Sequence, residues 1–229
     1  MVNIPSLLDL LKAGAHFGHR PSKRHPKMEP YLYSERDNVN IINLEQTQGK
    51  LKDALDFVKE VAKKNGVILF IGSKRQAKAI IKKYAEEIGM PYVIERWVGG
   101  TFTNFGNIIK LINKLKDWEN KKLQGEFNKY TKKEQLDFEK EINRLNLLVG
   151  GIRNLTKLPE AVYLIDLKKE KTALREAQKM NVPIIAITDS NINPTGVNYP
   201  IPANDDATKT IEMITNLIAE AVKEGRENK

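Results

Sequence analysis

Three short runs of apolar residues recur along the chain and predict strands that are buried on both faces. They occupy residues 67–71, 161–165 and 183–187, and none of them contains a charged residue. A strand with one solvated face alternates apolar and polar positions, whereas a strand of a parallel sheet covered on both sides is apolar throughout. Residues 39–43 and 92–94 are predicted to form two further strands.

Helical periodicity fills the segments between these runs. Apolar positions recur three or four residues apart, which is the spacing of one helix face. The predicted helices lie near residues 7–11, 51–62, 74–88, 174–177 and 205–223. Ser6 is expected to cap the first of them, with Asp9 three positions later. Because strands alternate with helices, the predicted fold class is α/β, a doubly wound, mainly parallel sheet with helices on both faces.

The alternation is interrupted over residues 104–150 by two amphipathic helices. Their apolar positions step by three or four through residues 105–118 and 138–149. A short turn separates them, and Thr131 followed by Glu134 predicts a capping box at the start of the second helix. We therefore expect an inserted two-helix hairpin with coiled-coil packing, whose apolar stripes form its seam.

These elements predict how the chain is divided. Residues 1–103 and 151–224 are expected to form one α/β body, Rossmann-like or flavodoxin-like, with a basic N-terminal segment. Residues 104–150 are the hairpin insertion, and residues 225–229 are expected to be a flexible tail. A length of 229 residues is enough for such a body with an ample core.

Composition narrows the classes of function. Lysine and arginine number 38 against 29 acidic residues, and the resulting net charge of +9 favours an anionic partner such as nucleic acid. The absence of cysteine excludes disulfides, thiol nucleophiles and thiolate zinc sites. No run approaches the ~18 apolar residues of a membrane span, and residues 1–6 lack the features of a signal peptide. We expect a cytoplasmic protein without a membrane partner.

A basic segment near the N-terminus is the first candidate for contact with RNA. Its cationic and histidine side chains are Arg20, Lys23, Arg24, His25 and Lys27, and no acidic residue falls among them. Prolines at positions 21 and 26 disfavour regular helix, so an exposed, stiff loop is expected, followed by tyrosines at strand spacing. Positive charge beside aromatic rings suits a phosphate backbone with unstacked bases, and a solvated basic loop is the alternative.

Residues 72–77 connect a buried strand to a helix, where dinucleotide-binding enzymes have their glycine fingerprint. Glu95 follows near the distance of a ribose-binding acid. A pyrophosphate needs glycine at position 74, and this chain has lysine there, so we predict no cofactor and no small-molecule substrate. Lys74 and Arg75 are instead candidates for holding an RNA phosphate, with an ordinary solvated first helical turn as the alternative.

Residues 96–104 form the second candidate surface. Two adjacent glycines at positions 99 and 100 let a backbone approach a partner closely. The side-chain donors of this segment are Arg96, Thr101, Thr103 and Asn104. The alternative is a tight turn between body and hairpin with Trp97 in the core, and both interpretations can hold together.

A metal site and a catalytic site are weighed against simpler interpretations. His16 and His19 invite a metal hypothesis, but no carboxylate close in sequence completes a zinc set. Asp189, Asp205 and Asp206 would have to approach through the fold. We predict no metal, and we expect Asp205 and Asp206 to cap the last helix. No serine lies in a Gly-x-Ser-x-Gly elbow, so no catalytic residue is predicted.

Several motifs, in one order and at one spacing, give the chain a resemblance to a known family. They include residues 10–20 (Leu-Leu-Lys-Ala-Gly-Ala-His-Phe-Gly-His-Arg), 41–44 (Ile-Ile-Asn-Leu), 70–77 (Phe-Ile-Gly-Ser-Lys-Arg-Gln-Ala), 96–105 (Arg-Trp-Val-Gly-Gly-Thr-Phe-Thr-Asn-Phe) and 199–207 (Tyr-Pro-Ile-Pro-Ala-Asn-Asp-Asp-Ala). Nearly end to end, the chain resembles the family of the second protein of the bacterial small ribosomal subunit.

The resemblance implies a non-catalytic, ribosome-bound structural protein with a helical hairpin protruding from an α/β body. It implies small-subunit ribosomal RNA and neighbouring ribosomal proteins as partners, near the junction of the subunit's head and body. One of these is the large first protein, which helps to recruit messenger RNA where an organism has it. Because fold does not fix function, a nucleotide-binding enzyme is the main alternative, and a metal-dependent protein is the third.

Overall fold

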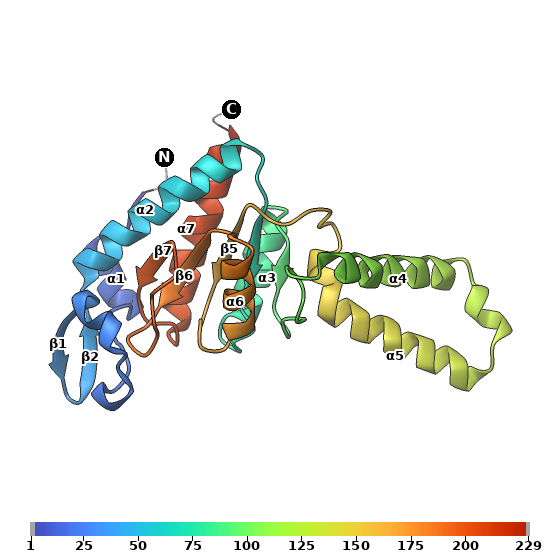
Figure 1. The fold of residues 1–229 in the computed structure, drawn as a ribbon, viewed down its shortest axis with the longest axis horizontal. Coiled ribbons are helices and arrows are strands. Elements are labelled where there is room, and N and C mark those ends of the chain that lie inside the picture. Colours follow the sequence, from blue (N-terminus) through green and yellow to red (C-terminus); the bar gives the residue numbers. More distant parts are fainter. Residues whose placement is uncertain (1–2, 228–229) are drawn as a thin grey trace.

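The structure is a computed structural model that describes residues 3–227, and at its centre lies a five-stranded sheet (Figure 1). Its strands, in the spatial order β4-β3-β5-β6-β7, are β3 (Ile68–Ile71), β4 (Tyr92–Val93), β5 (Ala161–Leu164), β6 (Ile184–Thr188) and β7 (Tyr199–Pro202). Every neighbouring pair is parallel. The predicted α/β fold with a mainly parallel sheet is confirmed.

β7 is the strand that the sequence pattern did not predict. It contains Pro200 and Pro202, which pair with Ala186 and Thr188 of β6. Proline cannot donate to a ladder, so it is tolerated in a strand at the edge of a sheet, where one side has no neighbouring strand. The position of β7 at the edge explains how a proline-containing segment can extend the sheet.

Helices cover both faces of the sheet, as predicted. Those of the body are α1 (Leu7–Ala13), α2 (Leu44–Lys63), α3 (Lys78–Glu87), α6 (Lys171–Lys179) and α7 (Thr208–Glu227). One face, with Phe70, packs against α1, α2, α3 and α7. The other face, with Leu69, packs against α6 and the base of the hairpin. Successive side chains of a strand point to opposite faces, so this double cover explains why the strands are apolar throughout.

The helical hairpin projects from the body (Figure 1) and consists of α4 (Phe105–Leu123), η3 (Glu126–Lys129) and α5 (Lys132–Val149). The predicted capping box of Thr131 and Glu134 is present at the start of α5. Ion pairs link the two helices, with Nζ of Lys122 2.8 Å from the carboxylate of Glu139. Beyond α5, η4 (Gly150–Ile152) returns the chain to the body. The coiled-coil packing of the hairpin stays a prediction.

A small antiparallel hairpin precedes α2. It consists of β1 (Leu32–Arg36) and β2 (Val39–Ile42). Its turn residues, Asp37 and Asn38, have φ angles of 51° and 60°, the left-handed conformation that two-residue hairpin turns require and that Asp and Asn tolerate. The strand predicted over residues 39–43 is thus present as β2.

Several predicted boundaries need correction. α3 begins at Lys78 instead of residue 74, because residues 74–77 form a turn. α7 begins at Thr208 instead of residue 205. The amides of residues 206 and 207 donate to Oδ1 of Asn204, so the predicted capping by the aspartates at 205 and 206 is wrong.

The predicted tail is also wrong for residues 225–227, which continue α7. Gly225 is buried where α7 crosses α2, and Lys59 and Glu224 pair across the same contact at 3.1 Å. The last two residues of the predicted tail, like residues 1–2, lie outside the described residues. Of the helices within residues 3–227, none combines the length and the apolar character that crossing a membrane requires.

Gly225→Ala tests the packing of α7 on α2. Alanine improves helix propensity by up to ~1 kcal/mol, but a Cβ at residue 225 would lie 2.6 Å from the carbonyl oxygen of Lys59. We expect a net loss of about 1–3 kcal/mol in the free energy of unfolding, measured by urea denaturation. Gly106→Ala in α4 is the matched control, because nothing lies within 4 Å of its Cβ. Equal stabilisation by both substitutions would contradict this account.

Candidate nucleic-acid interface

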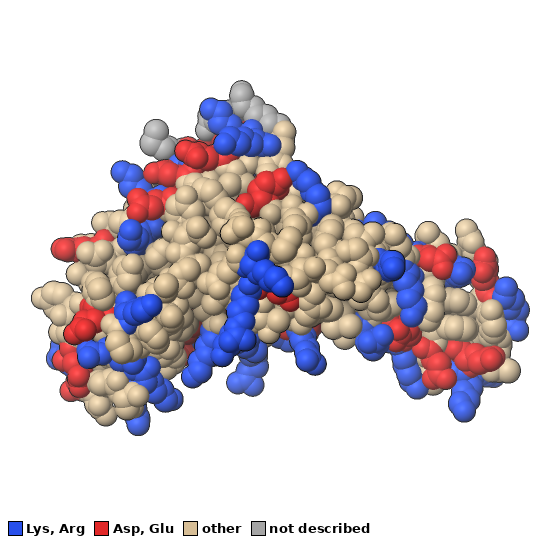
Figure 2. Space-filling model, in the orientation of Figure 1, with Lys and Arg blue, Asp and Glu red and all other residues tan. Residues whose placement is uncertain are grey.

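The parallel sheet gathers most of the candidate residues at one end. Loops that follow parallel strands meet at the edge formed by the strands' carboxyl ends. We call this end the carboxyl edge, and its loops are residues 72–77, 94–104, 165–170, 189–198 and 203–207. The carboxyl edge faces downward in Figure 2, which shows lysine and arginine side chains projecting along that side of the molecule.

The N-terminal basic segment is tied to the carboxyl edge by its backbone. The amide of His25 donates to the carbonyl of Ser190 (2.9 Å), and the amide of His19 donates to Oγ of Ser190 (2.7 Å). A Cβ at Gly18 would lie 2.7 Å from the same Oγ, so only glycine fits this close approach. Met28, fully buried, anchors the far end of the segment.

The side chains of this segment point outward from that fixed backbone. Arg20, Lys23, Arg24 and Lys27 are exposed, whereas His25 is half-buried. Nδ1 of His25 accepts from the amide of Lys27 (3.2 Å), and Nζ of Lys27 donates to Thr195 (3.0 Å). The segment forms two short 3₁₀ helices, η1 (Pro21–Lys23) and η2 (Pro26–Tyr31), that begin at the two prolines. It therefore presents cations on a constrained backbone.

Lys74 lies inside the carboxyl edge and serves an internal ion-pair network. Its Nζ is 2.7 Å from Asp206, 2.8 Å from Asp205 and 3.7 Å from Asp166. Burial alone would lower the pKa of Lys74, but its hydrogen bonds to Asp205 and Asp206 outweigh burial and raise that pKa. We therefore withdraw Lys74 from the candidates for phosphate contact, while its neighbour Arg75 is exposed.

The side chain of Glu170 fills the turn where nucleotide-binding enzymes hold a phosphate. The amide of Ser73 donates to Oε1 of Glu170 (3.0 Å), and the Ser73 hydroxyl donates to the same oxygen. Glu170 is buried, and burial raises the pKa of its carboxyl group. Because the side chain of Glu170 occupies this turn, the amide and the hydroxyl of Ser73 are not free to bind a pyrophosphate.

The loop over residues 96–104 is directed partly inward. Thr101 is buried and its hydroxyl donates to the carbonyl of Val98 (2.5 Å), so Thr101 is not accessible to a partner. The hydroxyl of Thr103 lies 3.4 Å from Glu176, and several amides of the loop also donate to that carboxylate. Arg96, Thr103 and Asn104 are exposed and keep their place among the candidates.

The sequence interpretation missed two acidic residues that organise these loops. Glu170 precedes α6 and Glu176 lies within it. Glu176 stands three positions after Ala173 and next to Ala177, both on the buried face of α6. An acidic residue on an apolar helix face was therefore a signal for an internal partner, although no local pattern names that partner.

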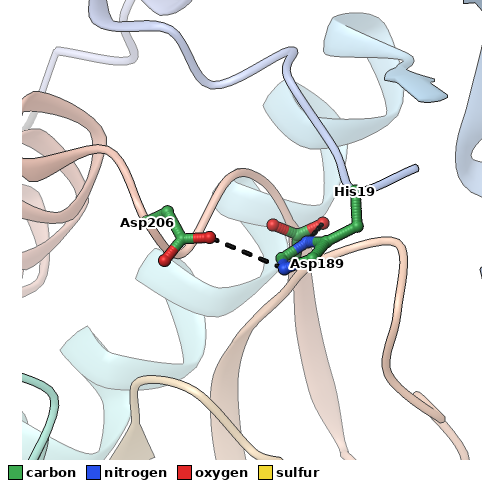
Figure 3. A group of neighbouring side chains, drawn as sticks. All are labelled: His19, Asp189 and Asp206. Carbon is green, nitrogen blue, oxygen red and sulfur yellow. Dashed lines mark ion pairs between the residues drawn. The ribbon is translucent and has the colours of Figure 1, made fainter. Parts of the chain in front are cut away.

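One histidine and two aspartates converge beside the basic segment (Figure 3). Nδ1 of His19 lies 3.1 Å from Asp189, and Nε2 lies 3.6 Å from Asp206. The Nδ1 contact lacks hydrogen-bond alignment, so it is an ion pair only when the ring is protonated. One ligand atom from each residue falls within 4.8 Å of the others, a donor set that could also hold a zinc ion. His16 does not join this group.

The surroundings of the two histidines predict opposite titration behaviour. Contact with Asp189 raises the pKa of His19 against the opposing effect of burial, whereas burial lowers the pKa of His16. We expect NMR titration to place the midpoint of His19 above 6.5 and that of His16 below it. The stabilisation from His19 is complete below pH 6.5 and is lost as the pH rises through its folded pKa. Asp189→Asn should lower the midpoint of His19 alone, and an unchanged midpoint would contradict the assignment.

The network around Lys74 predicts a large effect on stability. Lys74→Met leaves Asp205 and Asp206 without their shared cation, and we expect a loss of about 3 kcal/mol in the free energy of unfolding. Lys82→Met, at an exposed position of α3, removes the same charge and should change stability by less than about 0.5 kcal/mol. Urea denaturation of both variants measures the difference. Equal effects would show that the network contributes little.

Comparison with known proteins identifies the family of the chain. The family model described as ribosomal protein S2 matches residues 10–225. The small ribosomal subunit protein uS2 of Chloroherpeton thalassium is 47% identical over 216 residues, which are 94% of this chain and 86% of that protein. The protein of the same name from Salinibacter ruber is 45% identical over 217 residues, 95% of this chain and 68% of that protein. Because these matches span body and hairpin alike, the chain belongs to the ribosomal protein S2 family.

Proposed function

We propose that this protein is a non-catalytic structural component of the small ribosomal subunit that binds ribosomal RNA through its carboxyl edge and basic segment. The family to which the chain belongs is structural and not enzymatic. The observation that most supports RNA binding is the basic segment itself. Its exposed cations stand on a backbone held by Ser190, and the ion pairs within residues 3–227 include none of Arg20, Lys23 and Arg24.

The proposed binding is electrostatic and depends on the shape of the RNA. Arg20, Lys23 and Arg24 neutralise phosphates and release counterions, and Arg75 and Arg96 add exposed cations elsewhere on the carboxyl edge. A folded body with a projecting hairpin offers these cations in a fixed arrangement, which suits recognition of RNA shape and backbone. Base-specific contact is not needed for such binding.

Protein partners are proposed for the exposed apolar residues of the hairpin. Leu123, Leu136 and Leu147 lie on α4 and α5 with exposed fractions of 86%, 51% and 64%. Such residues are available to neighbouring proteins of the subunit. The large messenger-RNA-recruiting first protein is a proposed partner where an organism has it. In this proposal the protein acts on the ribosome in the cytoplasm, and cosedimentation of the tagged protein with small subunits tests that placement.

Two substitutions in the basic segment test the RNA contacts. Lys23→Ala with Arg24→Ala should weaken binding to a small-subunit ribosomal RNA fragment. The slope of log affinity against log salt concentration should fall by roughly one to two, because each phosphate contact contributes a little less than one. Equilibrium binding at several salt concentrations measures both quantities.

The control for this test removes the same number of positive charges at a site away from the proposed interface. Lys63→Ala with Lys64→Ala removes two exposed cations at the carboxyl-terminal end of α2, at the opposite end of the body (Figure 1). We expect the salt slope to stay near that of the unaltered protein. If both double variants lose the same affinity and slope, the basic segment has no special role in binding RNA.

A further inference from the structure

A single carboxylate holds the loop that leads from the sheet into the hairpin. Glu176 belongs to α6 on the body, and both of its oxygens accept hydrogen bonds from this loop. Oε1 accepts from the indole Nε1 of Trp97 (3.2 Å) and from the amide of Gly100 (2.8 Å). Oε2 accepts from the amides of Phe102 (3.0 Å) and Thr103 (3.3 Å). These hydrogen bonds join segments that are distant in the sequence, since Glu176 and Thr103 are 73 residues apart.

The charge of Glu176 is compensated by neutral dipoles. Its side chain is nearly buried, with 8% of the residue exposed, and each of these donors is an uncharged N–H or O–H group. Burial would raise the pKa of Glu176, but the hydrogen bonds from Gly100, Phe102 and Trp97 outweigh burial and lower it. The group is therefore ionised at neutral pH. Convergent amides of this kind bind an anion only when the backbone keeps one shape.

The loop has features that favour one conformation around this carboxylate. Gly100 has a φ of 89°, a left-handed conformation that turns the next amides toward Glu176 and that a side chain would strain. The rings of Trp97 and Phe102 pack edge to face with centroids 5.0 Å apart. Both rings are buried, so the loop is fixed by apolar contact on one side and by the carboxylate on the other.

The first helix of the hairpin follows this loop directly in the chain. α4 begins at Phe105, and the amide of Asn104 donates to the carbonyl of Gly100 (2.8 Å). The returning chain also fits tightly, because a Cβ at Gly151 would lie 2.2 Å from the carbonyl oxygen of Tyr92. The base of the hairpin is also held by apolar side chains, whose contacts have little directional preference. Arg153 adds polar contacts, because its guanidinium donates to Asn146 of α5 (2.8 Å) and lies 3.6 Å from Glu119 of α4.

We propose that Glu176 is the positioning residue of the hairpin. Through the loop of residues 97–104 it fixes the direction in which α4 leaves the body. It also fixes the place of the exposed Asn104 beside the carboxyl edge. The part of this inference that concerns RNA rests on the proposed function, whereas the part that concerns the direction of the hairpin does not.

The absence of cysteine allows a direct measurement of that direction. Lys52→Cys in α2 and Lys133→Cys in α5 introduce two exposed labelling sites, one on the body and one on the hairpin. Pulsed electron paramagnetic resonance measures the distribution of distances between spin labels attached at these two sites. Glu176→Gln keeps the size of the side chain but replaces one acceptor oxygen by an NH₂ group. We expect a broader or shifted distribution in this variant.

Two further variants make the measurement decisive. Glu212→Gln, at an exposed position of α7, removes the same charge far from the loop and should leave the distribution unchanged. Trp97→Phe removes one donor to Glu176 and keeps an aromatic ring, so it should broaden the distribution in the same sense. If Glu176→Gln does not fold, Trp97→Phe still tests whether the contact between Glu176 and the loop positions the hairpin. Distributions that match the unaltered protein in the folded variants would overturn the proposal and assign the direction of the hairpin to the other contacts at its base.

The link with RNA is tested separately. Glu176→Gln should weaken binding to a small-subunit ribosomal RNA fragment several-fold while the salt slope stays unchanged, because no phosphate contact is removed. A broadened distance distribution with unchanged RNA affinity would support the positioning role and overturn its link with RNA. If the unaltered protein does not bind RNA, the proposed function fails, and the distance measurement still tests Glu176.

Discussion

The central sheet presents apolar side chains on both faces, so both faces must be covered, and this requirement arranges the rest of the molecule. Four helices cover one face, while α6 and the base of the hairpin cover the other. The hairpin is therefore joined to the core through buried side chains such as Ile112 and Leu145, and only its outer part projects. The same parallel order of strands brings their following loops to one edge, where charged residues that are distant in sequence meet.

The crevice at that edge distinguishes this protein from enzymes with a similar body. In a nucleotide-binding enzyme the turn after the first strand offers free amides to a phosphate. Here the amide of Ser73 binds Glu170, and Lys74 is surrounded by aspartates. Ser73 and Lys74 are thus engaged by internal carboxylates, and the cations left for a partner lie on the outer loops. The architecture is shared, but the chemistry of the crevice is that of a structural protein.

Local sequence patterns predicted the features that depend on local physics. Unbroken apolar runs predicted the buried strands, and Thr131 with Glu134 predicted a helix start, because the partners of a capping box are three residues apart. Contacts between distant residues could not be predicted in this way. Lys74 meets Asp205 across 131 positions, and Glu176 meets Gly100 across 76, and no local pattern encodes either pair. The predicted tail failed for the same reason, since the groove that receives Gly225 belongs to α2.

The packing of α7 on α2 has a consequence for how the chain is made. Synthesis proceeds from the N-terminus, so α2 leaves the ribosome early, whereas α7, which covers much of its apolar side, is the last of the helices within residues 3–227 to emerge. Two strands of the sheet, β6 and β7, also appear late. A nascent chain therefore keeps the apolar side of α2 exposed to solvent until α7 has been synthesised. Because this surface is covered only late, an incomplete chain is prone to aggregate until α7 packs on α2.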